Sequence, residues 1–139
     1  MVNKKNLNMS SKLPAITLLD SIALIDSSNA GTIVVTGSHG GRSAAGFVVD
    51  VSEKPLAVFF NDAGGGKDNA GKVGLDMLQA IGVPAACYSH MSARIGDAQD
   101  GLDHGILTDM NDLAKLVGIK KDMQVLQAVD CFILQITDS

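Results

Sequence analysis

The sequence of 139 residues has little aromatic and glutamate content: it contains no tryptophan, one tyrosine, four phenylalanines and a single glutamate, Glu53. So few rings leave little for the stacking of nucleic-acid bases. No apolar run approaches the roughly 18 to 20 residues of a membrane-spanning helix. The first residues also lack the apolar core of a signal peptide. We therefore expect no membrane span and no nucleic-acid partner.

Arginine is also scarce, since Arg42 and Arg94 are the only two, and fourteen of the fifteen acidic residues are aspartate. Aspartate favours caps, turns and sites, whereas glutamate sits well within helices. We expect most acidic side chains in loops. Residues 1–12 hold three of the eleven Lys and Arg residues and are predicted to form a flexible tail. The rest of the chain then has a net charge near −7, the wrong sign for neutralising phosphates.

Only two cysteines are present, Cys87 and Cys131, and both lie in apolar surroundings without a second pair that would complete a zinc ligand set. We expect reduced thiols and a cytoplasmic location. With 46% hydrophobic and 19% charged residues, the chain has enough apolar side chains for a real core. Residues 13–139 are therefore predicted to form one domain.

Short apolar runs with little alternation at 32–36, 56–60 and 83–88 indicate strands buried on both faces of a parallel sheet. Between them, helices are predicted around 42–49 and, from apolar residues at helical spacing, over 68–81. This βαβαβ order predicts an α/β fold, a single three-layer domain with a mainly parallel sheet of flavodoxin-like or Rossmann-like kind.

The two ends of the domain are less regular. The runs 15–19 and 22–25 are compatible with two strands or with a strand and a short helix, and we favour the strand first. Beyond the third central strand, a helix is predicted from Asp109, as its N-cap, to Val117, with Gly118 as the stop. The run 129–136 is then predicted to be a last strand.

The loops after the three central runs concentrate glycine, histidine and arginine, and ligands bind beyond the carboxyl ends of such strands. Imidazoles titrate nearest neutral pH, a carboxylate can orient them, and hydroxyls can act as nucleophiles. The candidates for catalysis are accordingly His39, His90, Asp62, Ser38 and Ser89. The alternative is that the histidines cap nearby backbone groups and that Asp62 caps the helix after the glycine turn.

Glycine-rich turns allow backbone N–H groups to converge on an anion, and a cationic side chain can then supply the charge. The predicted substrate-binding residues are Gly40, Gly41, Arg42, Gly64, Gly65, Gly66, Lys67, Ser92 and Arg94. The alternatives are plain strand-to-helix turns and, for Arg94, an ion pair with Asp97 or Asp100. No complete phosphate-binding loop motif is present.

Asp97, Asp100 and His104 would share one face if their segment were helical, and such a set can bind a divalent metal. A solvated acidic turn is favoured over this, because aspartate and glycine prefer turns. No cofactor is predicted, although a divalent metal is possible.

These patterns predict a small-molecule enzyme, a hydrolase or lyase that acts on a compact anionic or carbonyl-bearing substrate through His/Asp acid–base chemistry. The first alternative is a non-catalytic module that binds small anions or regulates a partner. The second is a metal-dependent hydrolase. Because a chain with few large side chains has little depth for enclosing a substrate, we expect a homo-oligomer.

Overall fold

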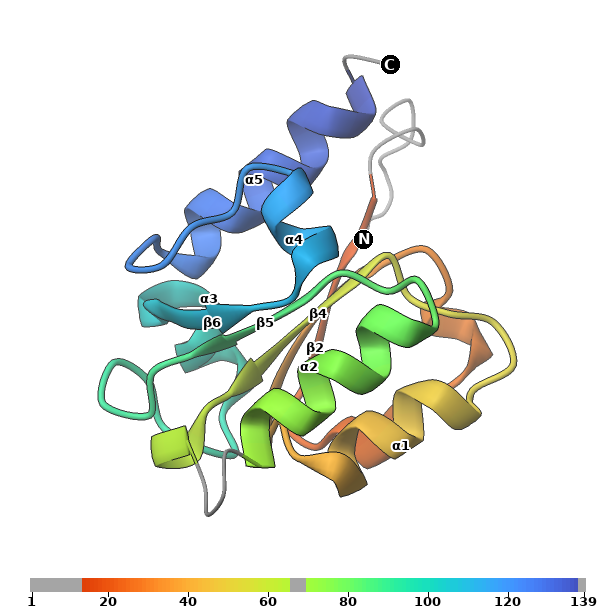
Figure 1. The fold of residues 1–139 in the computed structure, drawn as a ribbon, viewed down its shortest axis with the longest axis horizontal. Coiled ribbons are helices and arrows are strands. Elements are labelled where there is room, and N and C mark those ends of the chain that lie inside the picture. The colour runs from red at the N-terminus through yellow and green to blue at the C-terminus, as the bar shows by residue number, and fades with distance from the viewer. Residues whose placement is uncertain (1–13, 66–69, 138–139) are drawn as a thin grey trace.

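A computed structural model describes residues 14–65 and 70–137 as one α/β domain built on a five-stranded sheet (Figure 1). The strands lie in chain order, β2-β3-β4-β5-β6, and neighbours are parallel except for β5 and β6. Their bounds are β2 Ile16–Leu19, β3 Ile33–His39, β4 Ala57–Asn61, β5 Ala85–Tyr88 and β6 Leu107–Met110. The mainly parallel sheet predicted from the apolar runs is confirmed.

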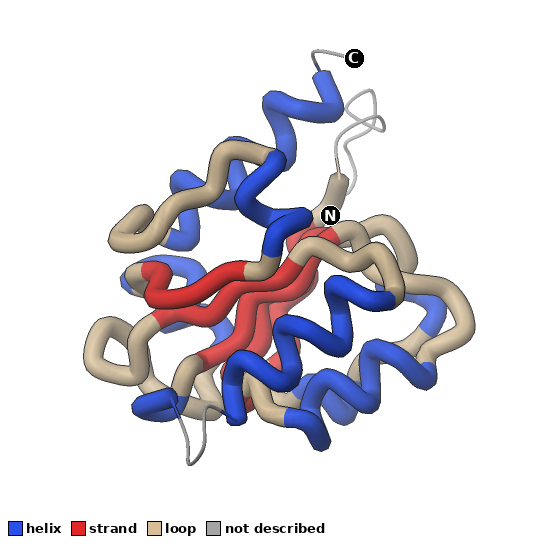
Figure 2. The backbone as a smooth tube through the Cα atoms, viewed as in Figure 1, coloured by secondary structure: helices blue, strands red, loops and turns tan. Residues whose placement is uncertain are grey.

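Helices cover both faces of the sheet, which Figure 2 shows as a red layer between blue helices. The α-helices are α1 Arg42–Asp50, α2 Ala70–Ala80, α3 Ala98–His104, α4 Asp112–Leu116 and α5 Val125–Thr137, and short 3-10 helices span Ile22–Leu24, Ser27–Asn29 and Ala63–Gly65. The parallel strands β2 to β5 lie side by side in chain order. Connections of the same handedness therefore place α1 and α2 on the same face of the sheet. Helices α3, α4 and α5 pack on the other side (Figure 1).

Strand β4 shows why the central strands are apolar throughout. Val58 and Phe60 point into the core under α1 and α2, while Ala57 and Phe59 point into the core under α5. Alternate residues of a strand face opposite sides, so a strand between two helical layers is apolar at every position. On the α5 side, the rings of Phe59 and Phe132 meet edge to face with centroids 6.1 Å apart. The fold thus has two apolar cores, one on each face of the sheet.

The predicted last strand at 129–136 is wrong, because this segment belongs to helix α5. The buried residues Val125, Ala128, Val129 and Phe132 recur at helical spacing, and Asp130 lies exposed between them. The fifth strand is instead β6, which no pattern predicted. It runs antiparallel and pairs Leu107 with Tyr88.

The predicted start of a helix at Asp109 is also wrong, because Asp109 lies in β6. Asn111 caps α4 instead, and its side-chain oxygen accepts a hydrogen bond from the backbone N–H of Ala114 at 3.1 Å. Gly118, with φ of 103°, follows the helix as predicted. The acidic segment after Asp97 was predicted as a turn, but it forms helix α3 with Asp97 as its N-cap.

At the beginning of the described chain, the strand expected at 15–19 is confirmed as β2, and 22–25 corresponds to a 3-10 helix. The predicted tail, 1–12, lies outside the described residues. Flavodoxin-like and Rossmann-like sheets both contain a reversal of strand order, and the described strands contain none. Within residues 14–65 and 70–137, no helix has the length and apolar character needed to cross a bilayer.

Candidate functional site

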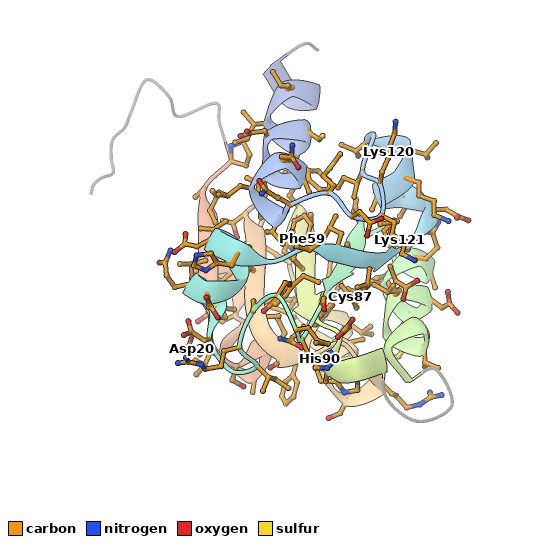
Figure 3. The ribbon with its side chains drawn as sticks, turned by 90° about the vertical axis from the view of Figure 1, so that its left-hand side faces the viewer. Asp20, Phe59, Cys87, His90, Lys120 and Lys121 are labelled. Carbon is orange, nitrogen blue, oxygen red and sulfur yellow. The ribbon has the colours of Figure 1, made fainter. Side chains whose placement is uncertain are left out.

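The polar loops predicted as a site lie at the carboxyl ends of β3, β4 and β5. The antiparallel strand β6 begins at the same edge, because Leu107 pairs with Tyr88, the last residue of β5. Figure 3 shows His90 of the loop after β5 in the lower part of the view, below Cys87 of β5. Segments far apart in sequence therefore meet at this edge.

Asp62 follows β4 directly and is held from several sides. Its backbone N–H donates to the Tyr88 carbonyl at 2.8 Å, and its side chain is only 14% exposed. Carboxylate oxygen Oδ1 accepts hydrogen bonds at 2.9 Å from the backbone N–H groups of Gly64 and His90. The second oxygen, Oδ2, lies 3.1 Å from the hydroxyl of Thr108. These donors fix both the position and the rotation of the carboxylate.

The same Oδ1 atom lies 3.1 Å from Nδ1 of His90. The His90 side chain is 47% exposed, so a half-exposed imidazole contacts a largely buried carboxylate. In the neutral imidazole, a hydrogen bond to the carboxylate requires the proton on Nδ1, which leaves the lone pair on Nε2. This tautomer is assigned from the hydrogen-bond partner. The pair therefore resembles an oriented general base in its geometry.

The surroundings of the Asp62 carboxyl favour its charged form. Burial acts to raise its pKa, but hydrogen bonds from Gly64, His90 and Thr108 together outweigh burial, so the pKa lies below its ordinary value. Asp62 is consequently ionised at neutral pH and can orient an imidazolium as well as an imidazole.

The turn after β4 contacts the loop after β5. Asn61 is fully buried, its side-chain oxygen accepts from the Ala63 N–H at 2.7 Å, and its amide donates to the Ala93 carbonyl at 3.2 Å. Gly64 has φ of 83°, a region that favours glycine. A Cβ built on Gly64 would lie 3.6 Å from Cε1 of His90, so this turn passes beside the imidazole.

The predicted glycine anion site is only partly available to a ligand. The N–H of Gly64 is used by Asp62, and that of Gly40 donates to the Asn61 carbonyl at 3.1 Å. Gly65 ends the 3-10 helix Ala63–Gly65. The predicted binding residues Gly66 and Lys67 lie outside the described residues.

Ser89 and Ser92 hold the loop after β5 in place. The Ser89 hydroxyl accepts from the Met91 N–H at 3.0 Å. The Ser92 hydroxyl donates to the Ser89 carbonyl at 2.7 Å and accepts from the Ile106 N–H at 2.9 Å. Both hydroxyls thus hold backbone groups of this loop.

Ser38 and His39 lie in a different part of the edge. The Ser38 hydroxyl accepts from the Ile22 N–H at 2.9 Å. Both residues line a cavity of about 270 Å³ beside α1, and neither Asp62 nor His90 is among its lining residues. Nε2 of His39 is buried and has no hydrogen-bond partner within the part of the chain that the structure describes. The structure thus separates the two Ser-His pairs.

The turn before α1 is closely packed. A Cβ on Gly40 would lie 2.9 Å from Cβ of Phe60, and one on Gly74 of α2 would lie 2.0 Å from the Gly40 carbonyl oxygen. Glycine at both positions lets α2 approach this turn. Gly41 caps α1 without a side-chain hydrogen bond, and the following Arg42 is exposed. The first N–H groups of a helix have no partner within the helix, so this turn could receive an anion.

Arg94 lies exposed on the loop that carries His90. Its backbone N–H donates to Oδ2 of Asp100 at 2.7 Å. Among residues 14–65 and 70–137, no carboxylate lies within 4.0 Å of its guanidinium, so the alternative of an ion pair with Asp97 or Asp100 is not seen there. Within those residues the guanidinium has no carboxylate partner in an ion pair, and its fork of donors suits an anionic group.

The residues of the metal alternative come together only in part. Nδ1 of His104 lies 2.8 Å from Oδ1 of Asp100, while the Asp97 carboxylate accepts from the Asp100 N–H at 3.0 Å as the cap of α3. No group of three or more His, Cys, Asp or Glu side chains in the described ranges is arranged to hold a metal ion.

Two residues of the site were not among the predicted candidates, Asn61 and Thr108. Asn61 was detectable, because it is a polar residue at the end of an apolar strand. Thr108 was not, since β6 itself was not predicted. Searches with the chain find no matching protein-family model, no matching curated protein and no matching solved structure.

Proposed function

We propose that this protein is a small-molecule enzyme, a hydrolase or lyase, in which His90 transfers a proton and Asp62 orients it. The supporting observation is the contact of 3.1 Å between Nδ1 of the half-exposed imidazole and Oδ1 of the largely buried carboxylate. An imidazole oriented in this way can act as general base or general acid near neutral pH.

The proposed chemistry follows from the tautomer. With Nδ1–H directed at Asp62, Nε2 accepts a proton from a bound water or from an acidic carbon or hydroxyl of the substrate. The resulting imidazolium is stabilised by the Asp62 carboxylate, which then stays ionised while the imidazole returns its proton to the leaving group. The charge on Asp62 is therefore required in both steps.

Arg94 is the proposed binding residue for an anionic group, because its exposed guanidinium shares a loop with His90. Met91 and Ile95 on the same loop are 85% and 53% exposed. Exposed apolar side chains beside a polar site favour burial by a second molecule. We include in the proposal a homo-oligomer in which another subunit covers this loop. Size-exclusion chromatography tests it, and a monomer at working concentration would contradict it.

The placement of the site is that of flavodoxin-like and Rossmann-like proteins, in which ligands bind beyond the carboxyl ends of parallel strands. Asp62 and His90 follow two such neighbouring strands, β4 and β5. Kinship with either fold is part of the proposal and rests on this placement alone, since the described strands lack the reversal of strand order found in both folds.

The test is an activity screen by NMR with small carboxylic esters, amides, phosphate monoesters and hydroxy acids, with and without EDTA. The matched variants are His90→Gln and His104→Gln, because each histidine contacts an aspartate through Nδ1. Turnover is expected to fall at least 100-fold in His90→Gln, as general acid–base catalysis contributes about 10²- to 10⁴-fold. It should persist in His104→Gln. Full activity of His90→Gln would refute the proposed role, and loss with EDTA would favour the metal-dependent alternative.

A second candidate function, binding of a small anion without catalysis, is favoured by the cavity of about 270 Å³ at the start of α1. Ser43 and His39 line it, and within residues 14–65 and 70–137 no side chain caps the first turn of α1. Titration with inorganic phosphate, followed in ¹H–¹⁵N spectra, should shift the amides of Ser43 and Ala44 first. Unchanged spectra at millimolar phosphate would contradict this function.

A further inference from the structure

Thr108 connects the site to the edge strand of the sheet. Its hydroxyl lies 3.1 Å from Oδ2 of Asp62 and 3.3 Å from the carbonyl oxygen of Cys87. A hydroxyl has one proton to donate, and the charged carboxylate at the shorter distance is the stronger acceptor. The hydroxyl therefore donates mainly to Asp62.

We infer that Thr108 is a positioning residue for the His90–Asp62 pair: its hydroxyl holds Oδ2, so that Oδ1 faces the imidazole. The contribution of Thr108 to catalysis rests on the proposed function. Its contribution to the geometry and charge of the pair does not.

The two oxygens of Asp62 are held by different parts of the chain. Oδ1 contacts groups in adjoining loops, the N–H of Gly64 and the N–H and Nδ1 of His90. In the described part of the chain, the hydroxyl of Thr108 is the only donor within hydrogen-bond distance of Oδ2. Without it, the carboxylate can rotate and present either oxygen to His90, because the terminal torsion of aspartate is broad.

The backbone explains how Thr108 reaches the site. Strand β6 is antiparallel to β5, and their register shifts between Cys87 and Tyr88, at the end where the site lies. Residues just after the start of β6 are thereby placed beside the loop that carries His90. Three neighbouring strands thus position the set: Asp62 and His90 lie in the loops after β4 and β5, and Thr108 lies within β6.

The experiment compares Thr108→Val, which keeps the β-branched shape without the hydroxyl, with Thr17→Val. Thr17 is a matched control: it is also a half-buried threonine on an edge strand, and its hydroxyl lies 2.9 Å from that of Thr32. The measurements are the ¹³C titration of the Asp62 carboxyl and the ¹⁵N shifts of the His90 ring. Both are carried out on the full chain.

In Thr108→Val the pKa of Asp62 should rise, because one of the hydrogen bonds that lower it is removed. The His90 nitrogens should shift toward a mixture of tautomers. Thr108→Ser should restore both readouts, and Thr17→Val should change neither. If the wild type has measurable turnover, kcat should fall about tenfold in Thr108→Val with little change in KM, the loss typical of a hydrogen bond to a charged group.

An unchanged Asp62 titration together with unchanged ¹⁵N shifts of the His90 ring in folded Thr108→Val would overturn the inference. If Thr108→Val does not fold, the comparison of Thr108→Ser with Thr108→Ala decides: an equal Asp62 titration and equal His90 ¹⁵N shifts in those two variants would overturn it as well. An active His90→Gln enzyme would instead remove the proposed function and leave the positioning of Asp62 by Thr108 intact. The two failures are therefore distinguishable.

Discussion

Two histidine–aspartate pairs in this molecule have similar contacts and different surroundings. Nδ1 of His104 lies 2.8 Å from Asp100, closer than the 3.1 Å that separates Nδ1 of His90 from Asp62. Yet the Asp100 and His104 side chains are 29% and 68% exposed, against 14% and 47% for Asp62 and His90. The closer pair is the one more exposed to solvent.

The difference lies in what each pair needs in order to form. Asp100 and His104 are four residues apart on α3, so one turn of helix brings them together, and such exposed pairs contribute little. Asp62 and His90 meet only when β4 and β5 are paired. A catalytic group requires this kind of support from the surrounding fold, and a short distance alone does not identify it.

The largest expected effect concerns the packing of α3 against Tyr88. In Gly101→Ala the new Cβ would lie 2.6 Å from the hydroxyl oxygen of Tyr88, which is buried and donates to the Thr36 carbonyl at 2.7 Å. Because Tyr88 has no room to move, we expect a loss of about 2 to 3 kcal/mol in the free energy of unfolding, measured with urea. The Asp100–His104 pair would be displaced with the helix.

The matched control is Gly46→Ala on α1, where a new Cβ meets nothing within 4 Å. It should stabilise the protein by up to about 1 kcal/mol, because alanine is the better helix former. Equal effects of the two substitutions would show that α3 is not packed against Tyr88 as described.

The contrast between the pairs also shows what the sequence could predict. Asp62 and His90 were found because each follows an apolar strand, and parallel strands end at one edge. Thr108 was missed because β6 has only four residues and forms by antiparallel pairing with β5, which the local sequence does not indicate. The apolar run at 129–136 resembles a strand when it is considered alone. The helical spacing of the buried residues is recognisable only when Val125, which precedes the run, is included. A strand and a buried helix are hard to distinguish in so short a run.

His39 shows a different limit. It follows Ser38 just as His90 follows Ser89, and all four residues were candidates for catalysis. In the structure, Ser38 contacts the N–H of Ile22, whereas Asp62 contacts only His90 of the two histidines. Strand β3 also has a register shift before His39. Which loops converge depends on such shifts, and local sequence does not specify them.

A smaller effect is expected from removing each carboxylate. Asp62→Ala leaves three donor residues, Gly64, His90 and Thr108, without their common acceptor. We expect a loss of about 2 kcal/mol in the free energy of unfolding, the order of magnitude for a charged hydrogen-bond acceptor that is mostly buried. Asp100→Ala should cost clearly less, because its partners are more exposed. Urea unfolding of both variants tests this, and equal losses would remove the distinction between the two pairs.

The smallest expected effect is the pH dependence of stability. The hydrogen bonds to Asp62 lower its pKa in the folded state despite its burial, whereas in the unfolded chain it returns to about 3.9. Its ionised form therefore contributes full stability above about pH 4, and this contribution disappears as the pH falls through the lower folded value. The pKa of Asp100 is lowered in the same direction, first by the Arg94 N–H and then by His104. Asp100 is more exposed, so its share should be smaller and more sensitive to salt.

Urea unfolding of the wild type, Asp62→Asn and Asp100→Asn from pH 6 down to pH 2 separates these contributions. The stability difference between wild type and Asp62→Asn should shrink as the pH falls, and it should change little with added salt, because a buried carboxylate is screened weakly. The difference for Asp100→Asn should be smaller at every pH and should decrease further in 1 M salt. A salt-sensitive contribution from Asp62 would mean that its carboxylate is as exposed as that of Asp100, and the structural basis for assigning proton transfer to His90 would be lost.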